Sequence, residues 1–176
     1  MFSRKVQDVM NDQIQRELES AYIYLSMAAY FDSANLPGFA HWMKVQFQEE
    51  QAHAFKFYDF VNDRSGQVLL QALGQPPVKF QSPLDAFEKA LAHEEKITAH
   101  INDLYALATE EKDIASQNLL QWFVEEQVEE EKNAGDIVDM LKKIGDSNHA
   151  LIMLDRELGQ RPLPTQAGEQ APPAEL

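Results

Sequence analysis

The sequence predicts an all-α fold: a four-helix bundle with one long crossover and a short fifth C-terminal helix. The 7 glycines and 8 prolines fall at a handful of places, which leaves long stretches free to form uninterrupted helices. Apolar residues make up 44% of the chain and charged residues 25%, the proportions of a soluble globular protein. The lengths of the connections then determine how the helices are ordered.

Turn residues and capping signals predict the helix boundaries. Asn35-Leu36-Pro37-Gly38 ends the first helix, and the serine, proline and acid of Ser82-Pro83-Leu84-Asp85 start the third. Gly145 suits the end of the fourth helix, and Ser147 suits the start of the fifth. The expected helices span about residues 4–33, 37–64, 83–109, 114–145 and 147–158.

Two short connections and one long one predict the topology. A few residues join the first helix to the second and the third to the fourth, so each pair forms an antiparallel hairpin. The link over residues 65–82 can extend roughly 55 Å at about 3.3 Å per residue. A helix of about 27 residues is only about 40 Å long. The link therefore reaches along the whole bundle, which gives an up-down-down-up arrangement.

The length of 176 residues fits one domain, which we expect over residues 1–159. Residues 160–176 contain four prolines and almost no large apolar side chains, and we expect them to form a disordered tail. No apolar run is long enough for a transmembrane helix, and residues 1–8 lack the apolar stretch of a secretory signal. We therefore expect a cytoplasmic protein.

Charge and cysteine content exclude several classes of function. The 29 acidic and 15 basic residues give a net charge of −14, which disfavours binding to nucleic acid or anionic membranes and attracts cations. The sequence contains no cysteine, so disulfides, iron–sulfur clusters, thiolate metal sites and cysteine nucleophiles are excluded.

Polar side chains interrupt the apolar stripe of each long helix. At 100° per residue, Glu50 and Glu94 lie at the centres of the stripes of the second and third helices. Gln127 is central in the fourth helix, with Glu130 about 60° to one side. Glu17 lies within the stripe of the first helix, which consists of Met10, Ile14, Leu18, Ala21, Leu25 and Ala28. Each helix therefore places an acidic or amide group on the face that it should bury.

These polar residues repeat at matched spacings in the two hairpins. The spacing is 33 residues from Glu17 to Glu50 and from Glu94 to Gln127, and 36 residues from Glu17 to His53 and from Glu94 to Glu130. Each hairpin thus carries one acid on its first helix and an i, i+3 pair on its second. Amphipathic periodicity alone does not require this repeat, which is the plan of dinuclear carboxylate bundles.

The chemistry of this set points to a metal site. Buried carboxylates are costly unless they are protonated or neutralised by cations, and no lysine or arginine falls near the centres of the stripes. Glutamate, histidine and amide ligands suit iron(II), manganese or zinc. A solvated acidic face remains the simpler interpretation of Glu125 and Glu131. The other histidines show no ligand spacing, and they are His41, His93, His100 and His149.

Three segments resemble the ferritins, most closely the non-haem bacterial and archaeal ferritins of the ferritin-like superfamily. They are residues 16–24, 48–53 and 118–131, and the resemblance covers about residues 3–158. It implies a ferroxidase that oxidises iron(II) with dioxygen or hydrogen peroxide at a diiron centre within one subunit. It also implies storage of ferric mineral inside a hollow homo-oligomeric shell of 24 subunits.

The resemblance implies a role for each matching residue. Glu17, Glu50 and His53 match ligands of the first iron, with Glu50 as the bridge, and Glu94, Gln127 and Glu130 match the second iron site. Tyr24 matches a tyrosine beside the centre, a candidate electron donor. The residues that match a third iron site are Glu49, Glu126, Glu129 and the shared Glu130. An acidic lining without a defined third site is the alternative.

Two positions separate this chain from the haem-containing bacterioferritins. Those proteins carry a second E-x-x-H motif in the fourth helix and a haem-ligating methionine directly after the glutamate of the first motif. Here residues 127–130 read Gln-Val-Glu-Glu, and Gln51 follows Glu50. We therefore expect no haem.

Two other classes of function fit the same bundle. A diiron or dimanganese oxidase or catalase would hold two metals permanently and store no mineral. A structural bundle, or one that only buffers iron, would oxidise none. The amount of iron that each subunit retains after aerobic loading separates these possibilities.

Overall fold

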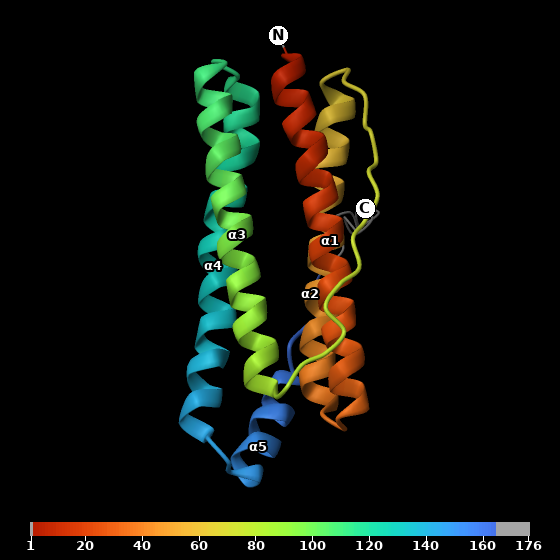
Figure 1. Ribbon diagram of the computed structural model, residues 1–176. Helices are drawn as coiled ribbons and strands as arrows, with labels where there is room; N and C mark the ends of the chain where they lie inside the picture. Colours follow the sequence, from red (N-terminus) through yellow and green to blue (C-terminus); the bar gives the residue numbers. More distant parts are fainter. Residues whose placement is uncertain (1, 165–176) are drawn as a thin grey trace, which may run out of the picture.

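The computed structural model describes residues 2–164, and within them the chain forms five helices and no strand (Figure 1). The helices are α1 (Arg4–Ser33), α2 (Pro37–Asp63), α3 (Pro83–Glu110), α4 (Ile114–Ile144) and α5 (Asn148–Leu158). The predicted all-α bundle of four long helices with a short fifth helix is confirmed. None of the helices in residues 2–164 has the length and apolar character needed to cross a membrane.

The four long helices form two antiparallel hairpins, α1 with α2 and α3 with α4, which pack side by side (Figure 1). The long crossover between α2 and α3 runs along α1 and returns the chain to the other end of the bundle. Side chains of α1 hold it there: Asn11 bonds Gln67 and Leu69, and Glu19 accepts from the backbone N–H of Gly74. The predicted up-down-down-up order is therefore present.

Capping side chains begin the helices where the sequence predicts them. Ser82 caps α3 by accepting from the backbone N–H of Asp85 at 3.1 Å, and Pro83 occupies the first helical position. Gly145 ends α4 with a φ of 54°, a left-handed conformation that glycine adopts at low cost.

Helix α5 is fixed to the beginning of α2, and this contact positions the chain that follows it. Asp155 of α5 accepts from the backbone N–H groups of Gly38 and Phe39 at 2.8 and 3.0 Å. It thereby caps α2, whose own N-cap residue Leu36 makes no side-chain cap bond. A Cβ atom at residue 38 would lie 1.6 Å from the Asp155 carbonyl oxygen, so the close approach requires glycine.

The apolar core consists of two clusters with a polar layer between them. One cluster includes Met27, Phe31, Phe39 and Phe87 near one end of the bundle, and the other includes Met10, Phe57, Ile101, Leu104 and Phe123 near the opposite end. Along each long helix, the predicted metal ligands fall between the residues of these two clusters. The polar layer therefore lies between the two hydrophobic clusters.

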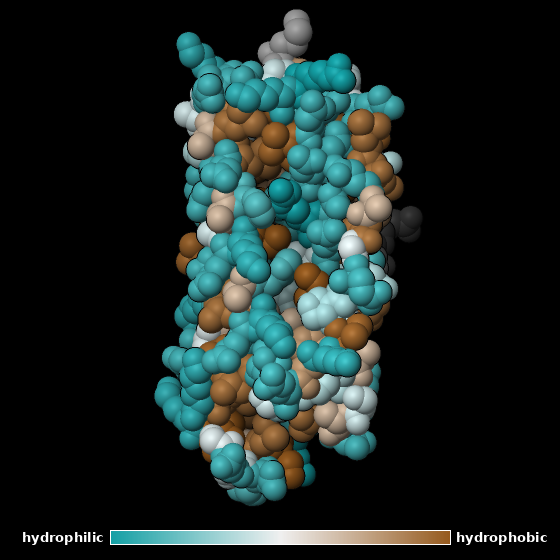
Figure 2. Space-filling view, viewed as in Figure 1, coloured by the Kyte–Doolittle hydropathy of each residue, from teal (hydrophilic) through white to brown (hydrophobic). Residues whose placement is uncertain are grey.

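The surface differs from the prediction at one core position. Leu25 was expected in the buried stripe of α1, but its side chain is 39% exposed. Helix periodicity identifies an apolar face but does not show how much of that face the neighbouring helices cover. Most of the face that carries α1 and α3 is hydrophilic (Figure 2). The division into a domain over residues 1–159 and a tail over 160–176 stays a prediction, since residues 165–176 lie outside the described part of the chain.

Candidate metal centre

Six predicted ligands are buried in the polar layer at the middle of the bundle. The exposed fraction is between 1% and 4% for each of Glu17, Glu50, His53, Glu94, Gln127 and Glu130. All four long helices contribute to this layer. Within residues 2–164, no lysine or arginine forms an ion pair with any of these four glutamates. Several acidic groups are thus buried together without a pairing cation.

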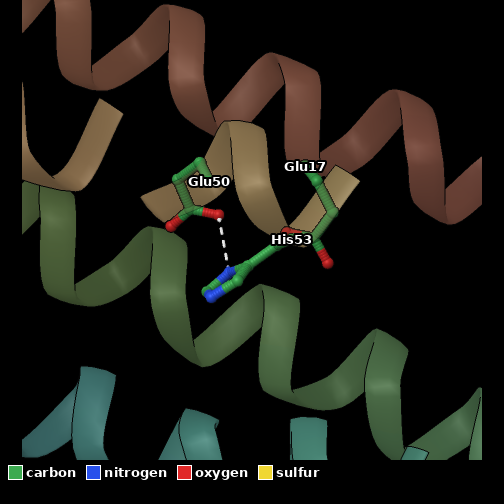
Figure 3. Close-up of side chains that lie close together, drawn as sticks. All are labelled: Glu17, Glu50 and His53. Atoms are coloured by element: carbon green, nitrogen blue, oxygen red, sulfur yellow. Dashed lines mark ion pairs between the residues drawn. The ribbon is translucent and has the colours of Figure 1, made fainter. Parts of the chain in front are cut away.

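Glu17, Glu50 and His53 form the tightest group. Their ligand atoms lie within 4.8 Å of one another (Figure 3). The Nδ1 atom of His53 is 3.4 Å from the Glu50 carboxylate, because the i, i+3 spacing puts both side chains on the same face of α2. Glu17 reaches them from α1. Two carboxylates and one imidazole nitrogen are therefore positioned to bind one metal ion.

Glu94 and Glu130 do not belong to that group, and other side chains orient them. The Tyr24 hydroxyl donates a hydrogen bond to Glu94, and the Gln127 amide donates to the same carboxylate at 3.3 Å. Glu130 accepts from Gln46 at 2.8 Å. Glu94 lies on α3 and Glu130 lies on α4, whereas the first group comes from α1 and α2. The carboxylates of Glu94 and Glu130 are a second group of buried acidic side chains in the polar layer.

Gln13 and Gln46 are site residues that sequence reasoning missed. Gln13 donates to the Glu17 carboxylate at 2.8 Å, and both glutamines are buried at 2% exposure or less. Gln13 and Gln46 precede Glu17 and Glu50 by four residues each, so they also stand 33 residues apart. This repeat was the available signal, since a residue four positions away lies on the same helix face.

The residues predicted for a third site lie beside the buried layer and are less enclosed. Glu49 and Glu126 are partly buried, and Glu129 is exposed. Glu126 approaches the Nε2 atom of His53 at 4.0 Å. Glu49 makes a 2.7 Å ion pair with Arg161, a partner that the sequence did not predict. Glu126 therefore lies next to the buried layer, whereas Glu49 forms an ion pair with an arginine.

Comparison with known proteins identifies the family. The family model described as "Ferritin-like domain" matches residues 7–144. The chain is 41% identical over 161 residues to a bacterial non-heme ferritin of Bacteroides fragilis, covering 92% of this chain and 100% of that one. The chain belongs to the ferritin family.

Other ferritins support the same assignment. A bacterial non-heme ferritin of Staphylococcus aureus is 36% identical over 161 residues, covering 92% of this chain and 97% of its own. The crystal structure of an open pore ferritin from Archaeoglobus fulgidus is 51% identical and superposes with a TM-score of 0.91, covering 92% of this chain and 100% of that one. The predicted resemblance to non-haem ferritins is thus confirmed.

Burial dominates the electrostatics of this ferritin's polar layer. Desolvation raises the pKa of Glu17 to about 7, against a smaller lowering by the Gln13 hydrogen bond. Desolvation, then the charge of Glu94, raises the pKa of Glu130 to about 8. Burial also raises the pKa of Glu94, and raises that of Glu50 well above its ordinary value. Without metal, much of this layer carries protons at neutral pH.

His53 has the opposite shift. Burial, then the charge of Lys56, lowers the pKa of His53 to about 4, so the imidazole is neutral at pH 7. A neutral imidazole keeps a lone pair available for a metal ion. Burial likewise raises the pKa of Tyr24, with Glu94 as the next cause, so its phenol stays protonated and can donate to Glu94. The polar layer of this ferritin therefore combines one neutral imidazole with several carboxyls whose pKa values are raised.

Proposed function

We propose that this ferritin oxidises iron(II) at a dinuclear centre within the subunit and stores the ferric product as mineral inside a homo-oligomeric shell. The position of Glu50 carries the proposal. Glu50 contacts Glu17 and His53, and its pKa responds to the charges of Glu94 and Glu130 as well. A carboxylate that faces both ligand sets is suited to bridge two ions.

In this proposal the two halves of the polar layer each bind one iron(II) ion. Glu17 and His53 bind the first ion, Glu94 and Glu130 bind the second with Gln127 nearby, and Glu50 bridges them. Carboxylates are hard ligands that stabilise iron(III) over iron(II). The single histidine leaves the ligand set loose enough to release product. Ion release is necessary because a storing subunit must pass iron on to the mineral.

Two neighbouring iron(II) ions give the reaction its electron balance. Together they supply two electrons, which reduce dioxygen to hydrogen peroxide without releasing superoxide, or reduce hydrogen peroxide to water. Each iron becomes iron(III), and either reduction consumes two protons, which the carboxyl protons displaced on metal binding can supply. Tyr24, bonded to Glu94, is the candidate donor of a further electron.

Exposed apolar side chains support self-association. They lie on α1, α2 and the crossover, and they include Tyr22, Leu25, Phe55, Tyr58, Leu69, Leu70 and Leu73. Apolar side chains gathered on neighbouring elements are typical of contact surfaces between subunits. We propose that a second copy of this chain covers them and that further copies complete a shell of 24 subunits. We also propose a cytoplasmic location and no bound haem.

A resident diiron or dimanganese oxidase is the alternative function, because carboxylates and histidine also suit manganese. The two functions differ in how much iron a subunit holds after oxidation. A resident oxidase holds two ions per subunit, whereas a storage subunit accumulates many more. Aerobic loading with iron(II) followed by iron analysis therefore distinguishes them.

We further propose a third iron site formed by Glu49, Glu126, Glu129 and the shared Glu130. Burial raises the pKa of Glu49 most, and the charges of Glu126 and Glu129 raise it further, which supports their proximity. Glu126, Glu129 and Glu130 share one face of α4 through i, i+3 and i, i+4 spacing. The site contains no histidine, so iron binds there more weakly than at the dinuclear centre.

The triple variant Glu49→Ala, Glu126→Ala and Glu129→Ala tests this third site. The first fast turnover should keep its rate, because the dinuclear ligands remain. The number of iron ions oxidised per subunit in that phase, or the rate of later turnovers, should change, as measured by stopped-flow absorbance. The control variant Asp59→Ala, Glu95→Ala and Asp103→Ala removes the same charge from exposed positions. A third-site variant that matches wild type in both quantities would mean that these glutamates only form an acidic lining.

A further inference from the structure

Arg161 lies directly against one of the proposed third-site glutamates. Its Nη2 atom is 2.7 Å from the Glu49 carboxylate, and its guanidinium group lies over the Trp42 ring at 4.6 Å. The ring of His41 donates a hydrogen bond to the Arg161 carbonyl at 2.7 Å. Only 18% of the Arg161 side chain is exposed. Three contacts with α2 therefore position this arginine from both its backbone and its side chain.

The charge of Arg161 acts on the acidic group around it. Burial is the largest cause that raises the pKa of both Glu49 and Glu130, and the charge of Arg161 opposes that rise, whereas the charges of Glu126 and Glu129 add to it at Glu49. Arg161 is thus a positive group paired with Glu49, and the charge of Lys56 acts in the same way on Glu126. A guanidinium group that bonds a carboxylate uses oxygen lone pairs that a metal ion would also need.

A space beside Arg161 offers the side chain a second position. A cavity of about 420 Å³ borders Arg161 and Trp42, and the carboxylates of Asp136 and Glu157 also line it. The Nη1 atom of Arg161 is buried and has no hydrogen-bond partner among the described residues. Its present position therefore leaves one donor unsatisfied. Two carboxylates border the same cavity as possible acceptors, Glu157 and Asp136, of which Asp136 already pairs with Lys132 at 2.5 Å.

The backbone at Arg161 is well anchored, so the movement would be one of the side chain alone. Asp155 fixes α5 to the N-terminus of α2, and the chain after α5 runs back beside α2 (Figure 1). The bond from His41 holds the carbonyl of Arg161 itself. The guanidinium group can leave Glu49 while α5 and the bundle stay in place.

We propose that Arg161 is a built-in competitor of iron at the third site, held on Glu49 when no iron is bound and displaced toward Asp136 and Glu157 when iron binds. The inference rests on the proposed function, since it requires Glu49 to be an iron ligand. The guanidinium group keeps Glu49 close to its final position and balances part of the acidic charge. The same pairing weakens iron binding, because the ion pair must break first. Arg161 is therefore a positioning residue that keeps iron at this site transient.

Arg161→Gln and the matched control Arg156→Gln test the proposal on the full-length oligomer. Arg156 is exposed, lies on α5 and forms no ion pair among residues 2–164, so its removal changes the charge equally. The probe is terbium(III), whose luminescence is sensitised by nearby tryptophans such as Trp42. The third-site signal is the part that Glu49→Gln removes from wild type. Arg161→Gln should tighten terbium binding to that component by roughly fivefold to tenfold, and Arg156→Gln should leave it unchanged.

The combined variants separate the failure of this inference from failure of the third site. If Glu49→Gln weakens terbium binding but Arg161→Gln behaves as Arg156→Gln does, Glu49 is a ligand and the competition by Arg161 is refuted. If Glu49→Gln changes nothing, the third site itself is refuted and the inference with it. The effect of Arg161→Gln must also vanish in the Glu49→Gln background.

Two further measurements complete the test. Arg161→Lys keeps the charge, so its terbium affinity should lie between those of wild type and Arg161→Gln. A crystal structure of the wild-type protein soaked with terbium(III) should have Arg161 separated from Glu49. Metal bound at Glu49 with the Arg161 ion pair still intact would overturn the proposal, whatever the affinities. Circular dichroism and oligomer size confirm that each variant is folded and assembled.

Discussion

Glu50→Ala is expected to abolish the fast phase of iron(II) oxidation. In the proposed centre Glu50 bridges the two iron ions, so one substitution would remove a ligand from each. Stopped-flow measurement under air should give a fall in initial rate of at least about 100-fold, as expected when a metal loses a direct ligand. Glu17→Ala and His53→Ala should damage mainly one of the two ions and leave residual binding of the other.

The Glu50→Ala protein should still fold and assemble. Substitution removes one of four acidic groups that are buried together without a pairing cation, and removing an uncompensated group of this kind is often neutral or stabilising. Its thermal midpoint without metal should be equal to or above that of wild type. Glu125→Ala, which removes an exposed glutamate from α4, is the control and should keep the wild-type rate. An oxidation rate near wild type in Glu50→Ala would refute the bridging role.

Metal binding should release protons, and its affinity should rise steeply with pH. The pKa of Glu17 is raised to about 7 and that of Glu130 to about 8, so both carboxyls hold protons at pH 6.5 that a bound metal displaces. Glu50 and Glu94 shift in the same direction. Calorimetric titration with zinc(II), which is not oxidised, should give a release of at least about two protons per subunit at pH 6.5.

The comparison of buffers with different ionisation enthalpies measures this release directly. Between pH 6.5 and 8 the zinc affinity should increase as the carboxyls lose their protons. Glu17→Gln should release fewer protons than wild type, which assigns part of the effect to this residue. A release close to zero at pH 6.5, with an affinity independent of pH, would mean that the carboxyls are already ionised without metal.

The same shifts determine how the stability of the metal-free protein depends on pH. The folded-state pKa values of Glu17 and Glu130 lie above the ordinary value of 4.5, so the folded chain binds more protons than the unfolded chain between pH 4.5 and about 8. The free energy of unfolding therefore falls as the pH rises through this range. His53, with its pKa lowered to about 4, acts oppositely and only below pH 6.5. From pH 6.5 to 8 the carboxyls dominate.

Local sequence signals predicted most of the fold because each was sufficient in itself. The helix ends depend on caps and breakers within a few residues, and α1 was predicted with its observed bounds. The polar layer was predicted from a repeat of 33 and 36 residues, which is visible in the sequence although its members lie on four different helices. The repeat did not predict the hydrogen bonds that orient these carboxylates, which come from Gln13, Gln46 and Tyr24.

The contacts that the sequence did not predict join residues far apart in the chain. Arg161 lies in a proline-rich segment whose composition predicts disorder, yet it pairs with Glu49, 112 positions earlier. Asp155 caps α2 from α5 across a similar separation. Leu25 fits the apolar stripe of its helix in the sequence, yet its side chain is exposed. Helix periodicity does not predict where the neighbouring helices lie. In each case the contact or the burial depends on where distant residues lie in the fold, which the local sequence does not determine.

Iron retained per subunit after aerobic loading tests the proposed storage function most directly. The assembled protein receives iron(II) in air in repeated additions, unbound iron is removed, and the remaining iron is measured against protein concentration. We expect tens of iron ions or more per subunit, eluting with the assembled shell. Retention of about two ions per subunit would instead indicate a resident oxidase, and retention of none would contradict both the metal centre and the storage function.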